Sequence, residues 1–183
     1  YSFDGRVFIT DFVTGWQSHN DGRLLSLNAG ENLYLPNETR EAAKLIAEGF
    51  DQRSSAELEK WLSHADSRVR LRAQVALTRK PDAISSFQKA INSNDLITRI
   101  HGIWGMGIIA RRGATPSPKG EFTEVSNFAS LREKAAAALT PLLKDSSPDV
   151  RVQALRVIRY APVKPETLSL TALLKDDSAA VRF

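Results

Sequence analysis

Hydrophobic and polar positions recur along most of the chain in a pattern typical of helical hairpins. Four ten-residue segments, 61–70, 90–99, 142–151 and 173–182, align with one another without gaps. Each holds the end of one helix, a polar turn, and a Val-Arg or Thr-Arg pair that enters a second helix. Because one hairpin cannot bury its apolar face alone, we expect each hairpin to cover the next. Core residues expected in the first hairpin are Leu62, Val69, Ala73 and Leu77.

The same pattern predicts the bounds of the helices. First helices are expected at about 55–64, 82–92, 130–144 and 165–175, and second helices at about 67–79, 96–111, 148–160 and from 179 onward. Helix starts are marked by side chains that accept hydrogen bonds from the first backbone N–H groups, which have no partner inside the helix. Capping boxes are expected at Ser54 to Glu57 and at Ser130 to Glu133, and N-caps at Asp66, Asp95, Ser147 before Pro148, and Ser178.

An arginine ends each aligned segment and predicts a ladder along the stack. Arg70, Arg99, Arg151 and Arg182 are 29, 52 and 31 residues apart, and the long interval holds an insertion of about twenty residues. We expect them to face the turn aspartates Asp95, Asp145 and Asp176, with Arg151 and Arg182 reaching toward carboxylates such as Asp145. Partly exposed ion pairs contribute only about 0–1 kcal/mol, so the ladder would set the repeat angle.

Two of the four turns depart from this pattern. The second has Asn94 for the usual aspartate and Thr98 for the usual valine, and the first has His64 at the aspartate position. We therefore expect these two turns to be the least regular.

The N-terminal part is different in character. Residues 6–13 and 23–27 alternate and are rich in β-branched and aromatic residues, which predicts two strands. Two strands are marginal alone, so we expect them to dock on the helices or to belong to a sheet that lies elsewhere. An amphipathic helix is predicted at 38–48, between Asn37 as N-cap and Gly49 after its end.

The recurring Leu-Leu-x-Asp followed by Val-Arg resembles the HEAT repeat. It predicts a mainly α fold, a right-handed α-solenoid of about four HEAT-type hairpins with a short N-terminal β-hairpin. The expected organisation is a strand region at 1–35, a linker helix at 36–53 and a HEAT-repeat domain at 54–183.

Composition limits the chemistry more than it indicates a partner. Apolar residues are 42% of the chain and charged residues 25%, which is ordinary for a folded protein. No apolar run approaches the roughly 20 residues that span a bilayer, so we expect no membrane insertion. The absence of cysteine removes disulfides, thiolate metal sites and covalently attached haem. A net charge of +4 allows an acidic partner without indicating one.

The insertion at 111–124 predicts a surface loop with Arg111, Arg112 and Lys119 as partner-binding candidates. The simpler interpretation, a tolerated loop that binds nothing, is favoured. Further arginines on the second helices, such as Arg68 and Arg156, suit nucleic-acid phosphates, but the ladder already uses several of them.

Other candidate sites are weaker. His19, His64 and His101 are scattered, with no pair at metal-ligand spacing, and no nucleophile elbow or phosphate loop is present. Gly102 to Gly107 lies inside a second helix, where its glycines suit close packing beside Trp104 better than a cofactor. We predict no catalytic residue, metal site or cofactor.

One polar and aromatic cluster lies in the strand region. It contains Trp16 and His19, which are further partner-binding candidates, together with Asp11 and Asp21. Asp11 and His19 would contribute to a cleft or cation site in a complete sheet. Turn stabilisation and packing of Trp16 on the helices is the favoured alternative.

Residues 5–16, 21–27, 48–55 and 98–104 are similar to parts of large secreted bacterial proteins described as membrane-bound dehydrogenases or haem-binding proteins. These join a sorbosone/glucose dehydrogenase-like β-propeller, HEAT repeats and a cytochrome c domain. The resemblance implies that the strands are the remnant of a propeller. It also implies a periplasmic or secreted oxidoreductase in which this chain is a non-catalytic scaffold that positions domains or docks a protein partner.

Both ends of the sequence suggest a longer protein. It starts at Tyr1 instead of Met and stops at Phe183, just inside a predicted helix. We expect Val181 and Phe183 to leave apolar surface exposed, which would permit self-association. The alternative is a stand-alone α-solenoid that binds nucleic acid or a peptide; a start codon near Tyr1 would favour it.

Overall fold

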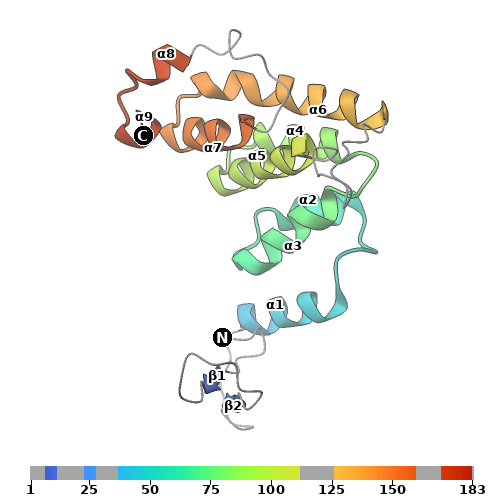
Figure 1. The fold of residues 1–183 in the computed structure, drawn as a ribbon. Helices are drawn as coiled ribbons and strands as arrows, with labels where there is room; N and C mark the ends of the chain where they lie inside the picture. Colours follow the sequence, from blue (N-terminus) through green and yellow to red (C-terminus); the bar gives the residue numbers. More distant parts are fainter. Residues whose placement is uncertain (1–6, 12–22, 28–36, 112–125, 160–169, 183) are drawn as a thin grey trace, which may run out of the picture. The chain divides into compact units, whose positions relative to one another are not determined.

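A computed structural model describes residues 7–11, 23–27, 37–111, 126–159 and 170–182. These residues are mainly helical, with a short two-stranded antiparallel sheet near the N-terminus, as the sequence predicts (Figure 1). The chain divides into two compact units, Tyr1–Phe50 and Asp51–Phe183.

The first unit contains both predicted strands. Strand β1 (Val7–Asp11) pairs antiparallel with β2 (Arg23–Leu27). Val7 lies opposite Leu27 and Asp11 opposite Arg23. All five residues of β2 are exposed, so this strand buries neither face within the described residues. Arg6 and residues 12–13, which belong to the first predicted strand, lie outside the described residues.

Helix α1 (Asn37–Glu48) completes the first unit and confirms the predicted amphipathic helix. Ala42 and Ile46 are buried on one face. Gly49 has a φ of 82°, the left-handed conformation that glycine adopts without a Cβ penalty, and its N–H donates to the Leu45 carbonyl. Asn37 is the first helical residue, not the cap before it.

The second unit is built from consecutive helices. Along the chain they are α2 (Ser55–Trp61), α3 (Ser67–Leu77), α4 (Ala83–Ile91), α5 (Leu96–Arg111), α6 (Ser126–Leu139), the 3₁₀ helix η1 (Thr140–Lys144), α7 (Pro148–Ile158), α8 (Leu170–Leu173) and α9 (Ala179–Arg182). Helix α2 packs on α3, α4 on α5, and α7 on η1 and α6.

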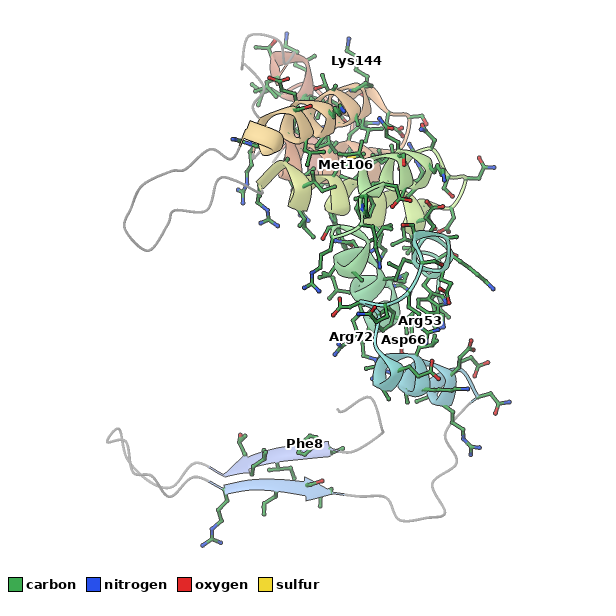
Figure 2. The ribbon with its side chains drawn as sticks, turned by 90° about the vertical axis from the view of Figure 1, so that its right-hand side faces the viewer. Phe8, Arg53, Asp66, Arg72, Met106 and Lys144 are labelled. Atoms are coloured by element: carbon green, nitrogen blue, oxygen red, sulfur yellow. The ribbon has the colours of Figure 1, made fainter. Side chains whose placement is uncertain are left out.

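Contacts between hairpins follow the chain order. The first helices contact one another from α2 to α4 to α6, and the second helices from α3 to α5 to α7 to α9. The core residues predicted for the first hairpin, Leu62, Val69, Ala73 and Leu77, are all buried. Met106 of α5 is also fully buried, in the interior of this unit (Figure 2).

Three of the predicted caps make their hydrogen bonds. At the start of α2 the Ser54 hydroxyl accepts from the Glu57 N–H, and the Glu57 carboxylate accepts from the Ser54 N–H, the reciprocal pattern of a capping box. The Asp66 carboxylate accepts from the Arg68 N–H, and the Asp95 carboxylate from the Thr98 N–H. Ser147 precedes Pro148 at the first position of α7, but its side chain makes no capping hydrogen bond.

Two predictions in the C-terminal half are wrong. Ser130 does not begin a helix, because α6 already starts at Ser126 and places Ser130 in its second turn. The same predicted helix ends as the 3₁₀ helix η1, where Pro141, which has no backbone N–H, stands in the first turn.

Val181 is buried, so the expected exposed valine is not found, whereas Leu174 is exposed. Phe183 and residues 165–169 lie outside the described part.

Candidate binding face of the second helices

The four turns share one local hydrogen bond. A side chain at the same place in each turn accepts the backbone N–H two residues later. The acceptors are His64 Nδ1 at 3.0 Å, Ser93 Oγ at 3.1 Å, Asp145 Oδ1 at 2.9 Å and Asp176 Oδ1 at 2.8 Å. The residue at the aspartate position of the second turn is therefore Ser93, not Asn94. In this hydrogen bond the first two turns are as regular as the others, although Arg99 of the second segment contacts its turn differently from the other arginines.

The ladder arginines fasten these turns to the second helices. The Nη1 groups of Arg70, Arg151 and Arg182 each donate to two carbonyls of their own turn, those five and six residues earlier. Arg99 differs, because its Nε donates to the Ile91 carbonyl at 2.9 Å. Each guanidinium thus satisfies carbonyl groups left open where a first helix ends.

Two arginines also reach a carboxylate of the following hairpin. Arg151 donates to both oxygens of Asp176, at 2.8 and 2.7 Å. Arg99 pairs with both oxygens of Asp145. The hydrogen bonds from Arg151 hold the pKa of Asp176 below its usual value. Burial alone would raise the pKa of Asp145, but the hydrogen bonds from Arg99 and the Ser147 N–H bring it below its usual value.

The predicted pairing of the ladder is thereby corrected. The Asp145 carboxylate pairs with Arg99, whereas Arg151 contacts Asp145 only at its backbone carbonyl. Arg182 donates to the Asp176 and Asp177 carbonyls. The difference arises because Arg99 and Arg151 lie about one turn of helix beyond their own polar turns, so the free edge of each guanidinium meets the next hairpin.

Arg70 is the exception in this series. No carboxylate within the described residues forms an ion pair with it, and Asp95 instead bonds Thr98. Its Nε donates to Nε2 of His101 at 3.1 Å. His101 is only 5% exposed, and its Nδ1 lies 2.7 Å from Oε1 of Gln74. Burial, assisted by the charge of Arg70, lowers the pKa of His101 to about 4. The histidine is therefore neutral at pH 7, with its proton on Nδ1 facing Gln74.

Trp104 stands beside this pair. Its ring meets His101 edge-on, with centroids 5.2 Å apart and planes at 77°, and its indole N–H donates to Gln153 of α7 at 2.9 Å. Trp104 is nevertheless 36% exposed, and Leu71 and Ile97 are 52% and 41% exposed. Such apolar exposure on adjacent helices is typical of a contact surface.

Two hollows adjoin at Trp104 and Leu71, which line both. One, of about 430 Å³, lies between α3 and α5 and reaches Gln153. The other, of about 390 Å³, lies between α5 and α7. Residues around the first hollow are Ser67, Arg68, Arg70, Ile97, Ile100 and His101. The two hollows together span α3, α5 and α7, and we call the pair of them the groove.

Charge on these helices is one-sided. Helices α3, α5 and α7 hold seven arginines and no lysine, with Asp149 as their one acidic residue. The seven are Arg68, Arg70, Arg72, Arg99, Arg111, Arg151 and Arg156. Arg72 and Arg156 are exposed and have no ion pair among the described residues, and Figure 2 shows Arg72 on α3. Arg68 is paired with Asp66, at 2.6 Å. We call the exposed surface of these three helices the second-helix face.

The glycines of α5 serve packing, as expected. A Cβ on Gly105 would lie 2.6 Å from Cδ1 of Phe87 and closer still to two other ring atoms. At Gly107 it would meet Val157, and at Gly102 it would meet Ala90 and the Ile91 backbone. The three glycines let α5 approach α4 on one side and α7 on the other.

The other predicted partner-binding residues are only partly placed. Arg111 is exposed at the end of α5 and lines the second hollow. Arg112, Lys119, Trp16 and His19 lie outside the described residues. The groove was not predicted from the sequence, although Leu71, Ile97 and Trp104 are apolar positions that fall outside the core stripe of their helices.

No three His, Asp or Glu side chains among the described residues gather as a metal-binding group. No helix in the described part of the chain is long and apolar enough to cross a membrane.

Comparison with protein families, with curated proteins and with solved structures gave no match to this chain. The class that the fold defines is a mainly helical protein with a short two-stranded N-terminal sheet.

Proposed function

We propose that the second unit is a right-handed α-solenoid of HEAT-type hairpins. Support comes from the contacts between α2, α4 and α6 on one side and α3, α5, α7 and α9 on the other. The ion pairs Arg99–Asp145 and Arg151–Asp176 link consecutive hairpins in the same order. A stack of this kind has an extended surface made by equivalent helices, which repeat proteins use for binding.

This solenoid acts as a non-catalytic scaffold that docks a protein partner or a neighbouring domain. The observation that carries the proposal is the second-helix face, where Leu71, Ile97 and Trp104 are exposed on or beside helices that hold seven arginines and one acidic residue. Interfaces are enriched in tryptophan and arginine, and charge complementarity selects partners of opposite sign. The face therefore suits an acidic segment that also carries apolar side chains.

The resemblance noted above supports placing this scaffold in a larger secreted oxidoreductase. The coding sequence on both sides of these 183 residues tests that part. Propeller repeats upstream and a Cys-x-x-Cys-His motif downstream are expected. A start codon near Tyr1 would overturn it and leave the scaffold on its own.

Nucleic-acid binding is the second candidate, favoured by the arginine excess. Phosphate contacts weaken steeply with salt, so a DNA affinity that falls strongly between 50 and 200 mM salt would support it. The apolar floor of the groove favours protein, and several of the arginines are already bonded to carbonyls and carboxylates.

Site-specific photo-crosslinking tests the docking role. A benzophenone amino acid replaces Arg72 on α3 or, as the matched control, Lys134 on α6; both positions are exposed. The experiment uses the protein at its natural length in its own cells. We expect crosslinks from position 72 to one defined segment and few from position 134. Equal or absent crosslinking at the two positions would contradict docking on the second-helix face.

A further inference from the structure

We infer that Arg70 and the hollow beside Trp104 form a subsite for a carboxylate side chain of a docked peptide, with an apolar neighbour of that side chain seated on Trp104. This inference rests on the proposed docking function and names the chemistry of its ligand.

The first argument comes from comparing equivalent arginines. Arg70 and Arg151 fix their Nη1 groups identically, on the carbonyls five and six residues earlier. The Nε and Nη2 edge of Arg151 then holds both oxygens of Asp176. The same edge of Arg70 has only the neutral His101 on Nε, and Nη2 has no partner among the described residues. Arg70 is thus held in the orientation that binds a carboxylate in the equivalent hairpin.

The following turn explains why Arg70 has no carboxylate partner. The position that holds Asp145 and Asp176 elsewhere is Ser93 here, which makes the local turn bond but carries no charge. A hydrogen bond between a guanidinium and a carboxylate is charge-assisted and stronger than one to a neutral group. A half-buried arginine whose ladder partner is missing is therefore a ready site for an external carboxylate.

The surroundings of Arg70 select a peptide. The hollow of about 430 Å³ is lined by Arg70 together with Leu71, Ile97, Ile100 and Trp104, so an apolar side chain fits beside the charge. His101, with its pKa lowered to about 4, adds no positive charge near pH 7. Arg68 at the rim is already paired with Asp66. Asp95 is near enough for the charge of Arg70 to lower its pKa, but its carboxylate is hydrogen-bonded to Thr98 and forms no ion pair with Arg70. Arg70 is therefore the one arginine lining this hollow that has no carboxylate partner among the described residues, and one guanidinium in apolar surroundings suits a single carboxylate better than a row of phosphates.

Ser93→Asp is the decisive variant, with Ser93→Asn as its neutral control. Aspartate fills this position in two other turns, so Ser93→Asp is compatible with the fold and supplies Arg70 with an internal carboxylate. The probe is an array of nonapeptides with glutamate at the centre and varied flanks, each beside a twin with central glutamine. Binding of the 183-residue chain to the strongest pairs is then measured by fluorescence anisotropy.

We expect the best glutamate peptides to carry leucine, phenylalanine or another apolar residue next to the glutamate. They should bind at least about tenfold more tightly than their glutamine twins, the effect of one charge-assisted hydrogen bond. Ser93→Asp should remove most of that difference, and Ser93→Asn should keep it. In NMR spectra, the Nε2 signal of His101 should shift on binding, because this atom accepts from Arg70.

Three results would overturn the inference. One is that glutamate and glutamine twins bind alike. Another is that the two Ser93 variants bind alike. The last is that single-stranded DNA displaces the peptides at lower concentration than any glutamate peptide does. If crosslinks from position 72 persist unchanged in Ser93→Asp, docking stands and only this subsite fails; if those crosslinks are absent in the unmodified protein, the docking proposal itself fails.

Discussion

Gly105→Ala should destabilise the helical unit strongly, although alanine is the better helix former. The added Cβ would lie within 2.6 Å of the ring of Phe87, which is fully buried between α4 and α5. Ordinary contact begins at 3.4 Å, so the ring or the helix must move by about 1 Å. Overpacking of a filled core costs about 1–3 kcal/mol or more, and alanine recovers about 1 kcal/mol of helix propensity. A clash this close belongs at the upper end of the overpacking range, about 3 kcal/mol, so the net loss of unfolding free energy is about 2 kcal/mol.

Thermal unfolding followed by circular dichroism measures this loss. For a unit of this size, about 2 kcal/mol lowers the melting temperature by roughly 5–10 °C. Gly107→Ala is the matched comparison in the same helix, because its Cβ would meet Val157, which is half-buried and better able to move. It should cost less. Phe87→Leu removes the clashing ring, so Gly105→Ala should cost much less in that background, a coupling that a double-mutant cycle detects.

Full additivity of Gly105→Ala and Phe87→Leu would refute this reasoning. So would a Gly105→Ala protein as stable as the unmodified chain. Either result would mean that α4 and α5 do not approach through Gly105.

Two further predictions concern polar groups of the core. The buried Ser86 hydroxyl has no hydrogen-bond partner among the described residues, so Ser86→Ala should raise the free energy of unfolding by about 1 kcal/mol in urea titrations; a loss of that size would reveal a partner for the hydroxyl. Because the pKa of His101 is lowered from 6.5 to about 4, the unfolded chain takes up a proton between these values while the folded chain does not. Stability should therefore fall by up to about 3 kcal/mol as pH drops from 6.5 to 4, and His101→Gln should flatten that slope; an equal slope in both proteins would count against a buried neutral histidine.

The helices could largely be predicted from sequence because their local signals agree with their packing. Helix α5 has the predicted bounds, since Asp95 caps its start and its apolar positions are long and continuous. Helix α6 was less predictable. Ser130 has the local chemistry of a cap, but the structure carries the helix one turn further back, to Ser126.

The binding face was harder to predict than the core. Repetition identified the arginines, but their partners lie in the next hairpin, so the pairing of Arg99 with Asp145 depends on how the hairpins pack. Among the described residues, Arg99, Arg151 and Arg182 make no contact with a histidine equivalent to that of Arg70 with His101. That Arg70 lacks a carboxylate partner becomes visible only when α3 is packed against α5.

Spin-label distances across the first helices test the proposed row of hairpins most directly. The chain has no cysteine, so pairs introduced at Lys60 on α2, Gln88 on α4 and Lys134 on α6, all exposed, can be labelled cleanly. Packed helices lie about 8–10 Å apart, so a row predicts two short neighbouring distances and a Lys60–Lys134 distance close to their sum. Three similar distances, or a Lys60–Lys134 distance shorter than either of the others, would contradict a stack in chain order.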